Sequence, residues 1–263
     1  MKEVKERFSV VIPVYNEAER IRNSLMEVRK TFDNFGCSYE VIAIDDGSSD
    51  NSYEILKKIK EEFPNLIVKK NSQNFGKGRA LKKAFKYVKG NLVVWLDADL
   101  DLHPFQIKTF YDIMMLNKAD IVIGSKLHPN SKLSYPFHRK VISLCYYFLI
   151  RFLFGLPCHD TQTGIKLFKR NVLEKVLPRI LVKKFAFDLE VLVNAHQLGF
   201  KIVEAPVILD SKRECPRIGL RSIFATFWDT LAVWYRMYIL KYYDRIDYYR
   251  HKNLRHQFKR VRK

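Results

Sequence analysis

Short apolar runs alternate with amphipathic segments of helical length along the first 125 residues of the chain. The runs have the length and the β-branched content of strands, and the segments between them have the hydrophobic spacing of helices. We predict strands at 8–15, 39–45, 65–70, 91–97 and 120–125. We predict helices near 17–35, 51–62, 76–89 and 104–117. The alternation is typical of an α/β fold, with a mostly parallel sheet flanked by helices on both faces.

The alternation stops after residue 126, where a polar stretch leads into an apolar run at 141–157. A helix is predicted near 185–198, a strand at 201–209, and a C-terminal amphipathic helical segment, rich in aromatic residues, at 222–240. The runs at 141–157 and 222–240 are either helices packed on the domain or apolar faces that receive another molecule. We therefore divide the chain into one domain of catalytic size, 1–220, and an amphipathic, basic segment, 221–263.

The chain is strongly basic, with 47 Lys and Arg against 28 Asp and Glu and a formal net charge of +19. This excess is larger than solubility requires and indicates a polyanionic partner: a phosphorylated substrate, an anionic membrane surface or nucleic acid. The basic end, 241–263, directly follows the aromatic segment, which favours an anionic membrane surface. No nucleic-acid-binding signature is present, although a basic nucleic-acid-binding protein remains the alternative from a different class.

Several absences narrow the cellular location that the sequence predicts. The four cysteines show no CxxC spacing, which fits a reducing compartment. The N-terminus has no signal-peptide core. Arg151 interrupts one long apolar run, and Asp229 and Arg236 interrupt the other, so neither predicts a membrane-crossing helix. We expect a cytoplasmic protein that is peripheral on the membrane.

Three aspartates, Asp97, Asp99 and Asp101, alternate along the end of the fourth predicted strand. Alternate residues of a strand share a face, so these carboxylates are expected to converge, while Ala98 turns towards the core. Carboxylates this close repel one another unless a cation neutralises them, and oxygen ligands favour Mg2+ or Mn2+. For Asp101 the alternative is a helix cap ahead of Pro104.

Two more polar clusters follow predicted strands, and the carboxyl ends of parallel strands share one edge of a sheet. The cluster "IDDGSSDNS" contains Asp45 and Asp46, which either serve the turn or accept hydrogen bonds from a nucleobase or ribose. The turn "NFGKG" contains Gly76 and Lys77 and suits an anion. It has neither Walker nor GxGxxG spacing, so ATP hydrolysis and dinucleotide binding are poorly supported.

The segments "SVVIPVYNEAERI", "EVIAIDDGSSDNS", "NFGKGRAL" and "VVWLDADLDLHP" together resemble the family 2 inverting glycosyltransferases, which have the Rossmann-like GT-A fold. The later "DTQTGIKLFKR" and "FAFDLEVLVNAHQLGFKIVEAPVIL" look more narrowly like polyprenyl-phosphate sugar synthases. Dolichyl-phosphate β-glucosyltransferases and dolichyl-phosphate mannose synthases are the nearest in pattern. The resemblance covers residues 7–215.

The resemblance implies a role for individual residues. A nucleotide-sugar site would comprise Pro13, Tyr15, Glu17, Asp46, Lys77, Asp97, Ala98, Asp99, Asp160, Thr163 and Gly164. Metal ligands would be Asp97, Asp99 and Asp101, although mannose synthases often have Gln at the last position. The catalytic carboxylates would be Asp97, Asp99, Asp188 and Glu190. The acceptor phosphate would lie near Arg139, Ser143, Arg213 and Arg217.

The implied function is metal-dependent transfer of glucose or mannose, with inversion, from UDP-glucose or GDP-mannose to polyprenyl (dolichyl) phosphate at the cytoplasmic membrane face. A lipid phosphate is already anionic near neutral pH, so Asp188 and Glu190 would only position the sugar. A hydroxyl acceptor on a soluble glycan or protein is the alternative, and would need one of them as a general base. A nucleotidyltransferase is less well supported, because its Gly-rich N-terminal loop is absent.

Overall fold

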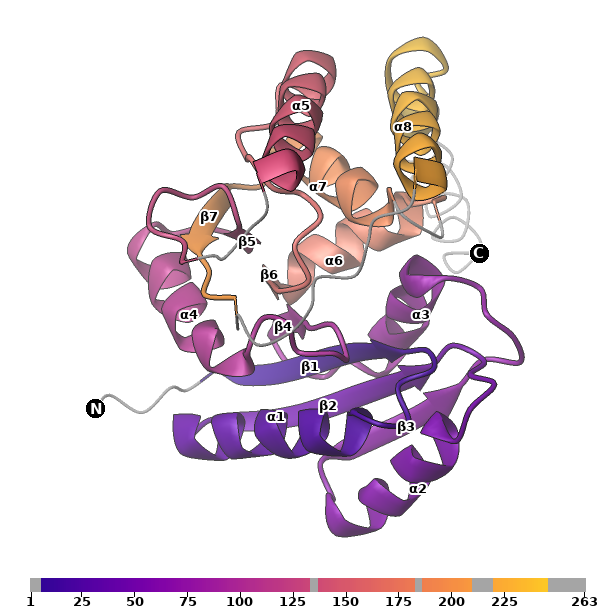
Figure 1. Ribbon diagram of the computed structural model, residues 1–263. Coiled ribbons are helices and arrows are strands. Elements are labelled where there is room, and N and C mark those ends of the chain that lie inside the picture. Colours follow the sequence, from indigo (N-terminus) through magenta and orange to yellow (C-terminus); the bar gives the residue numbers. More distant parts are fainter. Residues whose placement is uncertain (1–5, 133–136, 183–185, 210–219, 246–263) are drawn as a thin grey trace, which may run out of the picture.

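A seven-stranded sheet forms the centre of the protein in the computed structural model (Figure 1). The structure describes residues 6–132, 137–182, 186–209 and 220–245, without the side chains of 137–140 and 220–223. The strands are ordered β3-β2-β1-β4-β6-β5-β7. Their bounds are Arg7–Val14 (β1), Ser38–Asp45 (β2), Leu66–Lys70 (β3), Leu92–Trp95 (β4), Ile121–Ser125 (β5), Lys166–Lys169 (β6) and Ile202–Pro206 (β7).

Every strand pair is parallel except those of β6, which runs antiparallel to both β4 and β5. This reversal has a consequence for the position of the loop before β6. The N-terminal end of β6, where Lys166 is paired with Trp95, lies at the carboxyl edge of the parallel strands. The loop before β6 therefore meets the loops that follow β1, β2 and β4.

Helices cover both faces of the sheet, because alternate residues of the buried strands point to opposite sides. Val10 and Ile12 of β1 pack with α1 (Ile21–Phe35), α2 (Ser52–Glu62) and α4 (Ile107–Leu116). Val11 packs on the other face, with the helices Lys77–Ala84 (α3), Arg170–Val176 (α6) and Phe187–Gln197 (α7). The predicted α/β architecture is confirmed.

Two longer helical segments project from the end of the molecule at which these loops meet (Figure 1). They are α5 (Phe137–Phe154) and α8 (Leu220–Trp234), the latter continued by a π-helical turn at Tyr235–Ile239. Val233, Met237 and Tyr243 are buried in the same core as α7, so the segment after 221 packs on the sheet domain as far as it is described. None of the described helices combines the length and the apolar character that a bilayer crossing requires.

The predicted strands all exist, but two short elements, β6 and α6, were not predicted. The aspartate run also differs from the prediction. Strand β4 ends at Trp95, and residues 97–101 form a turn in which Leu100 has a left-handed backbone (φ 49°). The expected burial of Ala98 is nevertheless observed.

Candidate active site

A cleft of about 660 Å3 opens at the carboxyl edge of the sheet. Its walls come from the ends of β1 and β2, the start of α3, the turn after β4, the loop before β6 and the first turn of α7. The lining residues are Pro13, Val14, Tyr15, Glu17, Asp46, Asn74, Gly76, Lys77, Asp97, Ala98, Asp99, Gln162 and Asp188. Loops far apart in the sequence thus bring most of the predicted nucleotide-sugar residues to one cavity.

Lys77 and Asp97 form an ion pair in this cleft, with 2.5 Å between Nζ and Oδ1. Burial works against the charge of Lys77, but the carboxylates of Asp97, Asp188 and Asp99 outweigh it and raise the pKa of the amine. The Lys77 side chain as a whole is 34% exposed and lines the cleft. A charged lysine at this position can stabilise a negatively charged group bound in the cleft.

Burial raises the pKa of Asp99, and the nearby carboxylates of Asp97 and Asp101 raise it further. The pKa of Glu17 on the same wall is also raised, first by burial and then by the charge of Asp99. Carboxylates held this close favour a positive partner. A divalent cation would supply one, since oxygen ligands suit Mg2+ and Mn2+.

Asp46 holds the turn that opens α3. Its carboxylate accepts hydrogen bonds from the Asn71 side chain at 2.6 Å and from the amide N–H groups of Phe75 and Gly76 at 3.2 and 2.7 Å. Gly76 has a left-handed φ of 95°, which favours glycine at the start of this helix. Asp46 therefore fixes the backbone beside Lys77 while forming part of the cleft wall.

Asp188 reaches the cleft from α7 and forms a 2.7 Å ion pair with Lys166 of β6. Burial alone would raise the pKa of Asp188, but the ammonium groups of Lys166 and Lys77 hold it below its ordinary value. The lowered pKa favours the anionic form of Asp188 in the cleft. Close packing helps to place α7, because a Cβ on Gly78 of α3 would overlap the Phe187 ring.

The sequence profile of glycosyl transferase family 2 matches residues 9–177, well over half of the chain. The chain belongs to glycosyl transferase family 2. This membership confirms the enzyme class that the motifs predict.

Among similar proteins of this class, the dolichyl-phosphate beta-glucosyltransferase ALG5D of Trichomonas vaginalis is 30% identical over 254 residues, 90% of this chain and 76% of that protein. ALG5A of the same organism is 33% identical over 209 residues, 76% of this chain and 64% of that protein. Glycosyltransferase AglD of Haloferax volcanii is 28% identical over 231 residues, 87% of this chain. The chain spans only 37% of AglD.

Two solved structures share the fold. A mannosyltransferase from Pyrobaculum calidifontis, in complex with GDP-Man and Mn2+, has a TM-score of 0.62 at 18% identity, over 90% of this chain and 65% of that one. Glucosyl-3-phosphoglycerate synthase from Mycobacterium tuberculosis, with Mn2+, UDP and phosphoglyceric acid, has a TM-score of 0.66 at 20% identity, over 88% and 78%. The predicted GT-A fold of this family 2 member is therefore confirmed.

The predicted three-carboxylate metal set needs a correction. In the part of the chain that the structure describes, no three Asp, Glu, His or Cys side chains are grouped to hold a metal ion. Asp97 and Asp99 line the main cleft, which Asp101 does not reach, and all three aspartates line a smaller cavity of about 80 Å3 beside it. Residues 97–101 form a turn and not an extended strand, so the three carboxylates lie near one another but do not converge as one set of metal ligands. A pair of carboxylates still fits a divalent ion whose other ligands come from phosphate oxygens and water.

The alternative interpretation of Asp101 as a helix cap is also wrong. His103 is the cap of the short helix that begins at Pro104, and its Nδ1 accepts a hydrogen bond from the amide of Phe105 at 3.2 Å. The amide of Asp101 instead donates to the carboxylate of Asp99 at 3.3 Å. Asp101 therefore belongs to the aspartate turn.

The prediction that Glu190 faces the reacting centre is wrong. Its side chain is fully buried and does not line the cleft. The carboxylate accepts from the amides of residues 181–182 at 3.0 and 2.7 Å, from the Tyr243 hydroxyl, and lies 3.5 Å from the Arg236 guanidinium. Residues two apart on a helix do not share a face, so α7 turns Asp188 to the cleft and Glu190 to the C-terminal segment.

The loop before β6 contributes Gln162 to the cleft, a residue that sequence reasoning missed although it stands inside the "DTQTG" motif. Asp160 and Thr163 are not among the lining residues. They shape the loop: Asp160 accepts from the amide of Gln162 at 3.2 Å, and the Thr163 hydroxyl donates to the carbonyl of residue 124. Gly164 lines the smaller cavity, and a Cβ there would overlap the carboxylate of Asp97.

Of the four residues assigned to the acceptor phosphate, the structure describes the side chain of Ser143 alone. Arg213 and Arg217 lie outside the described residues. Arg139 belongs to the first turn of α5, but its side chain lies outside the description too. Ser143 is half-buried on α5 and does not line the main cleft. Their roles stay predictions.

Proposed function

We propose that this protein is a metal-dependent, inverting hexosyltransferase that moves glucose or mannose from UDP-glucose or GDP-mannose to a polyprenyl phosphate such as dolichyl phosphate. The observation that carries the proposal is the cleft, in which Lys77 lies among the carboxylates of Asp97, Asp99 and Asp188. The names of the ALG5 relatives support the lipid acceptor, and the bound GDP-Man, UDP and Mn2+ of the two solved structures support the donor and the metal.

Asp97 and Asp99 would hold Mg2+ or Mn2+, which when bound would help to neutralise the diphosphate of the donor. Lys77 would bind the same diphosphate. As the bond from the sugar to the diphosphate breaks, negative charge grows on the leaving group, and the fixed ammonium stabilises it more strongly than in the ground state. Tyr15, 45% exposed on the cleft wall, is available to pack against the base.

The acceptor phosphate is anionic near neutral pH and needs no general base to attack the anomeric carbon. Asp188 would then act without moving a proton. Its ion pair with Lys166 keeps it anionic and fixes its position. A fixed carboxylate can position the sugar and stabilise the positive charge that develops on the ring during transfer.

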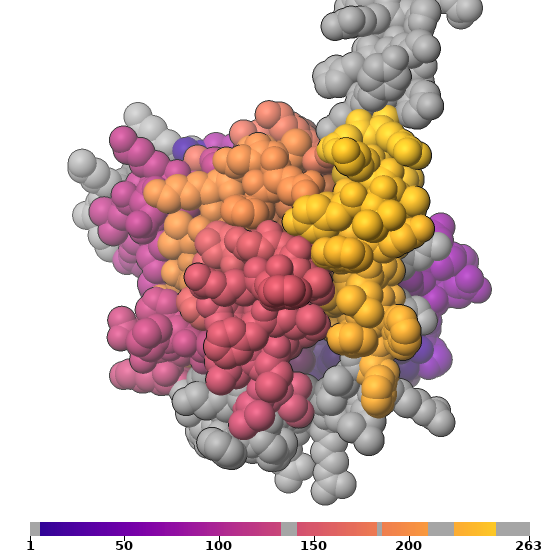
Figure 2. Space-filling model, turned by 90° about the horizontal axis from the view of Figure 1, so that it is seen from above, coloured from indigo at the N-terminus to yellow at the C-terminus, as the bar shows by residue number. Residues whose placement is uncertain are grey.

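Exposed apolar side chains on α5 and on the C-terminal segment support an acceptor that arrives from a membrane. Figure 2 looks down on this end of the molecule, where α5 and α8 occupy much of the surface. The large exposed side chains there are Val141, Ile142, Leu144, Phe148, Phe152, Phe224, Phe227, Trp228, Tyr235, Tyr238, Ile239 and Leu240. With the basic residues of 241–263, these faces would lie on an anionic bilayer. The free cysteines Cys37, Cys145 and Cys158 suit its cytoplasmic side.

The direct test is product formation. The protein is incubated with Mg2+, vesicles containing a polyprenyl phosphate, and labelled UDP-glucose or GDP-mannose in separate reactions. We expect an organic-extractable labelled lipid with one of the two donors, and none when a chelator removes the metal. Label transferred only to water-soluble acceptors would reject the lipid acceptor, and full transfer with the chelator present would reject the metal.

A further inference from the structure

The loop between α5 and β6 touches both the donor cleft and α5. Its C-terminal half reaches the cleft through Gln162 and through Gly164, which packs against Asp97. Its N-terminal half begins at Gly155, directly after the last turn of α5. The loop therefore connects the donor cleft to the end of α5.

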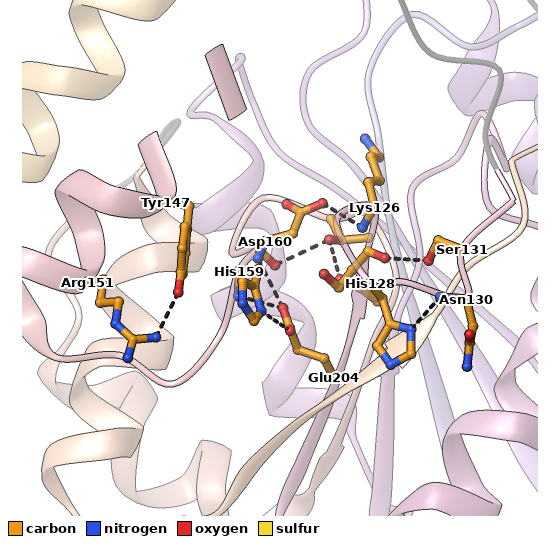
Figure 3. Close-up of polar contacts among 12 residues, drawn as sticks. Lys126, His128, Asn130, Ser131, Tyr147, Arg151, His159, Asp160 and Glu204 are labelled. Atoms are coloured by element: carbon orange, nitrogen blue, oxygen red, sulfur yellow. Dashed lines mark hydrogen bonds and ion pairs between the residues drawn. The ribbon is translucent and has the colours of Figure 1, made fainter. Parts of the chain in front are cut away.

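Glu204 of β7 holds the middle of this loop (Figure 3). Its Oε1 accepts from the amides of His159 and Asp160 at 2.6 and 3.1 Å, and its Oε2 lies 2.6 Å from the His159 ring Nδ1. The carboxylate side chain is only 11% exposed, so these contacts are largely shielded from water. A single carboxylate thus fixes the backbone and the side chain of the loop at the point where it approaches α5.

His159 extends the contact from Glu204 to α5. Its ring stacks on the Tyr147 ring, with 4.5 Å between the centroids and 29° between the planes. Tyr147 is 7% exposed, and its hydroxyl accepts from the Arg151 guanidinium at 2.7 Å. In Figure 3, Tyr147, His159 and Glu204 form a continuous row from α5 to the edge strand of the sheet.

The far end of the loop is held just as closely. Asp160 accepts from the amide of Lys126 at 3.1 Å, in addition to its contact within the loop. The Thr163 hydroxyl donates to the main chain of β5. Gly164 follows one residue later. The row from Glu204 to Tyr147 and the contact of Gly164 with Asp97 are therefore joined by a short, fixed segment.

We propose that Glu204 and His159 are positioning residues for sugar transfer, which hold α5 at a fixed place relative to the donor cleft. The proposal rests on the function proposed above, because α5 carries Arg139 and Ser143, two of the four residues assigned to the acceptor phosphate. Neither side chain lines the cleft, so both act through the loop and through Tyr147. Their effect should fall on the acceptor and on the catalytic rate rather than on donor binding.

The test uses the full chain and compares His159→Ala, Glu204→Gln and Tyr147→Ala with wild type. Each variant should raise KM for polyprenyl phosphate and lower kcat by about tenfold, since small displacements of reacting groups have large effects on rate. KM for the nucleotide sugar should stay within about twofold. Tyr147→Phe keeps the stacked ring and should behave like wild type, and His159→Ala with Tyr147→Ala should be no worse than either alone.

Asp120→Asn is the matched control. The Asp120 carboxylate also accepts a main-chain N–H from the start of β7, that of Lys201 at 3.0 Å, and pairs with Lys169 at 2.9 Å. It joins neighbouring strands at the end away from the cleft. The control should lose stability without a change in the acceptor KM. The proposal would be overturned if the KM values for acceptor and donor rose equally, in proportion to the loss of stability. It would also be overturned if Asp120→Asn showed the same kinetic change as the three variants.

Hydrogen exchange separates this inference from the proposed function. Glu204→Gln should speed exchange of the His159 and Asp160 amides, whereas Asp120→Asn should not. If wild type makes no lipid-linked sugar, the proposed function fails, and unchanged exchange in Glu204→Gln then overturns the positioning role as well. If wild type makes the product but all three variants match it, only the positioning role is wrong.

Discussion

Lys77 is the one basic side chain that the described cleft places against the aspartate turn. Lys77→Met keeps the length of the side chain but removes its charge. We expect kcat to fall about 100-fold to 1,000-fold, the usual effect of removing one fixed group that stabilises a developing anion. Steady-state kinetics with the accepted donor measures this.

Lys86→Met provides the comparison, because Lys86 is exposed beyond the end of α3 and outside the cleft. It should retain the wild-type rate. A Lys77→Met enzyme with more than about a tenth of that rate would show that the leaving group is stabilised elsewhere.

Asp188 provides a prediction about pH. The pKa of Asp188 in the folded protein lies below its ordinary value. The ion pair with Lys166 therefore stabilises the fold at neutral pH, and this stabilisation disappears as the pH falls through the lowered pKa. Asp188→Asn leaves the Lys166 charge buried without its partner and should cost about 3 to 5 kcal/mol at neutral pH. Urea unfolding at a series of pH values measures the difference from wild type. The difference in free energy of unfolding between wild type and Asp188→Asn should become smaller in acid. A difference that stays constant or grows would contradict a stabilising ion pair between Asp188 and Lys166.

At the scale of elements, Glu190 connects α7 to the C-terminal segment rather than to the substrate. The hydroxyl of Tyr243 donates to this fully buried carboxylate. Tyr243→Phe removes the hydroxyl that donates to the Glu190 carboxylate, and leaves this buried oxygen with one hydrogen bond fewer. We expect the free energy of unfolding to fall by about 1 to 3 kcal/mol. Tyr242→Phe, on the neighbouring and less buried ring, should cost much less in the same denaturation experiment. Equal effects would mean that Glu190 does not anchor the segment.

The elements that the sequence predicts well are those whose pattern follows from burial on both sides of a sheet. Strand β1 is an apolar run that is buried along almost its whole length, and its predicted and observed bounds differ by one residue at each end. Strand β6 was missed because it has four residues, two of them lysines. Lys166 is buried there only because Asp188 neutralises it, a partner that lies 22 residues away in the sequence. No local pattern contains that information.

The site shows the same division. The clusters at the strand ends predict that Asp97, Asp99 and Lys77 meet at one edge of the sheet, and the family resemblance implies Asp188 at the reacting centre. All four line the cleft. The sequence prediction was wrong where the local backbone conformation decides the direction of a side chain. The left-handed residue Leu100 turns the aspartate run out of an extended path, and Asp101 does not reach the main cleft that Asp97 and Asp99 line.

At the scale of the whole molecule, two sets of exposed apolar side chains can be compared. One lies on α5 and α8, above the cleft, and includes Phe152 at 88% and Trp228 at 67% exposure. The other lies at α4 on the opposite face of the sheet, and includes Leu116 at 83% and Phe105 at 50%. Only the first set lies on the helices that the proposed function places on the membrane, so the two sets give a matched comparison.

The double variant Phe152→Ser with Trp228→Ser should weaken binding to anionic vesicles by at least about tenfold, because each large side chain removed from an apolar phase is worth about 1.5 to 3 kcal/mol. Co-sedimentation with vesicles at low salt measures the loss. Leu116→Ser with Phe105→Ser should bind as wild type does. Salt should weaken binding of all forms, since the net charge of +19 contributes an attraction that ions screen. If both double variants lost vesicle affinity equally, membrane binding would not depend on α5 and α8 in particular. The exposed side chains of these two helices would then serve another partner.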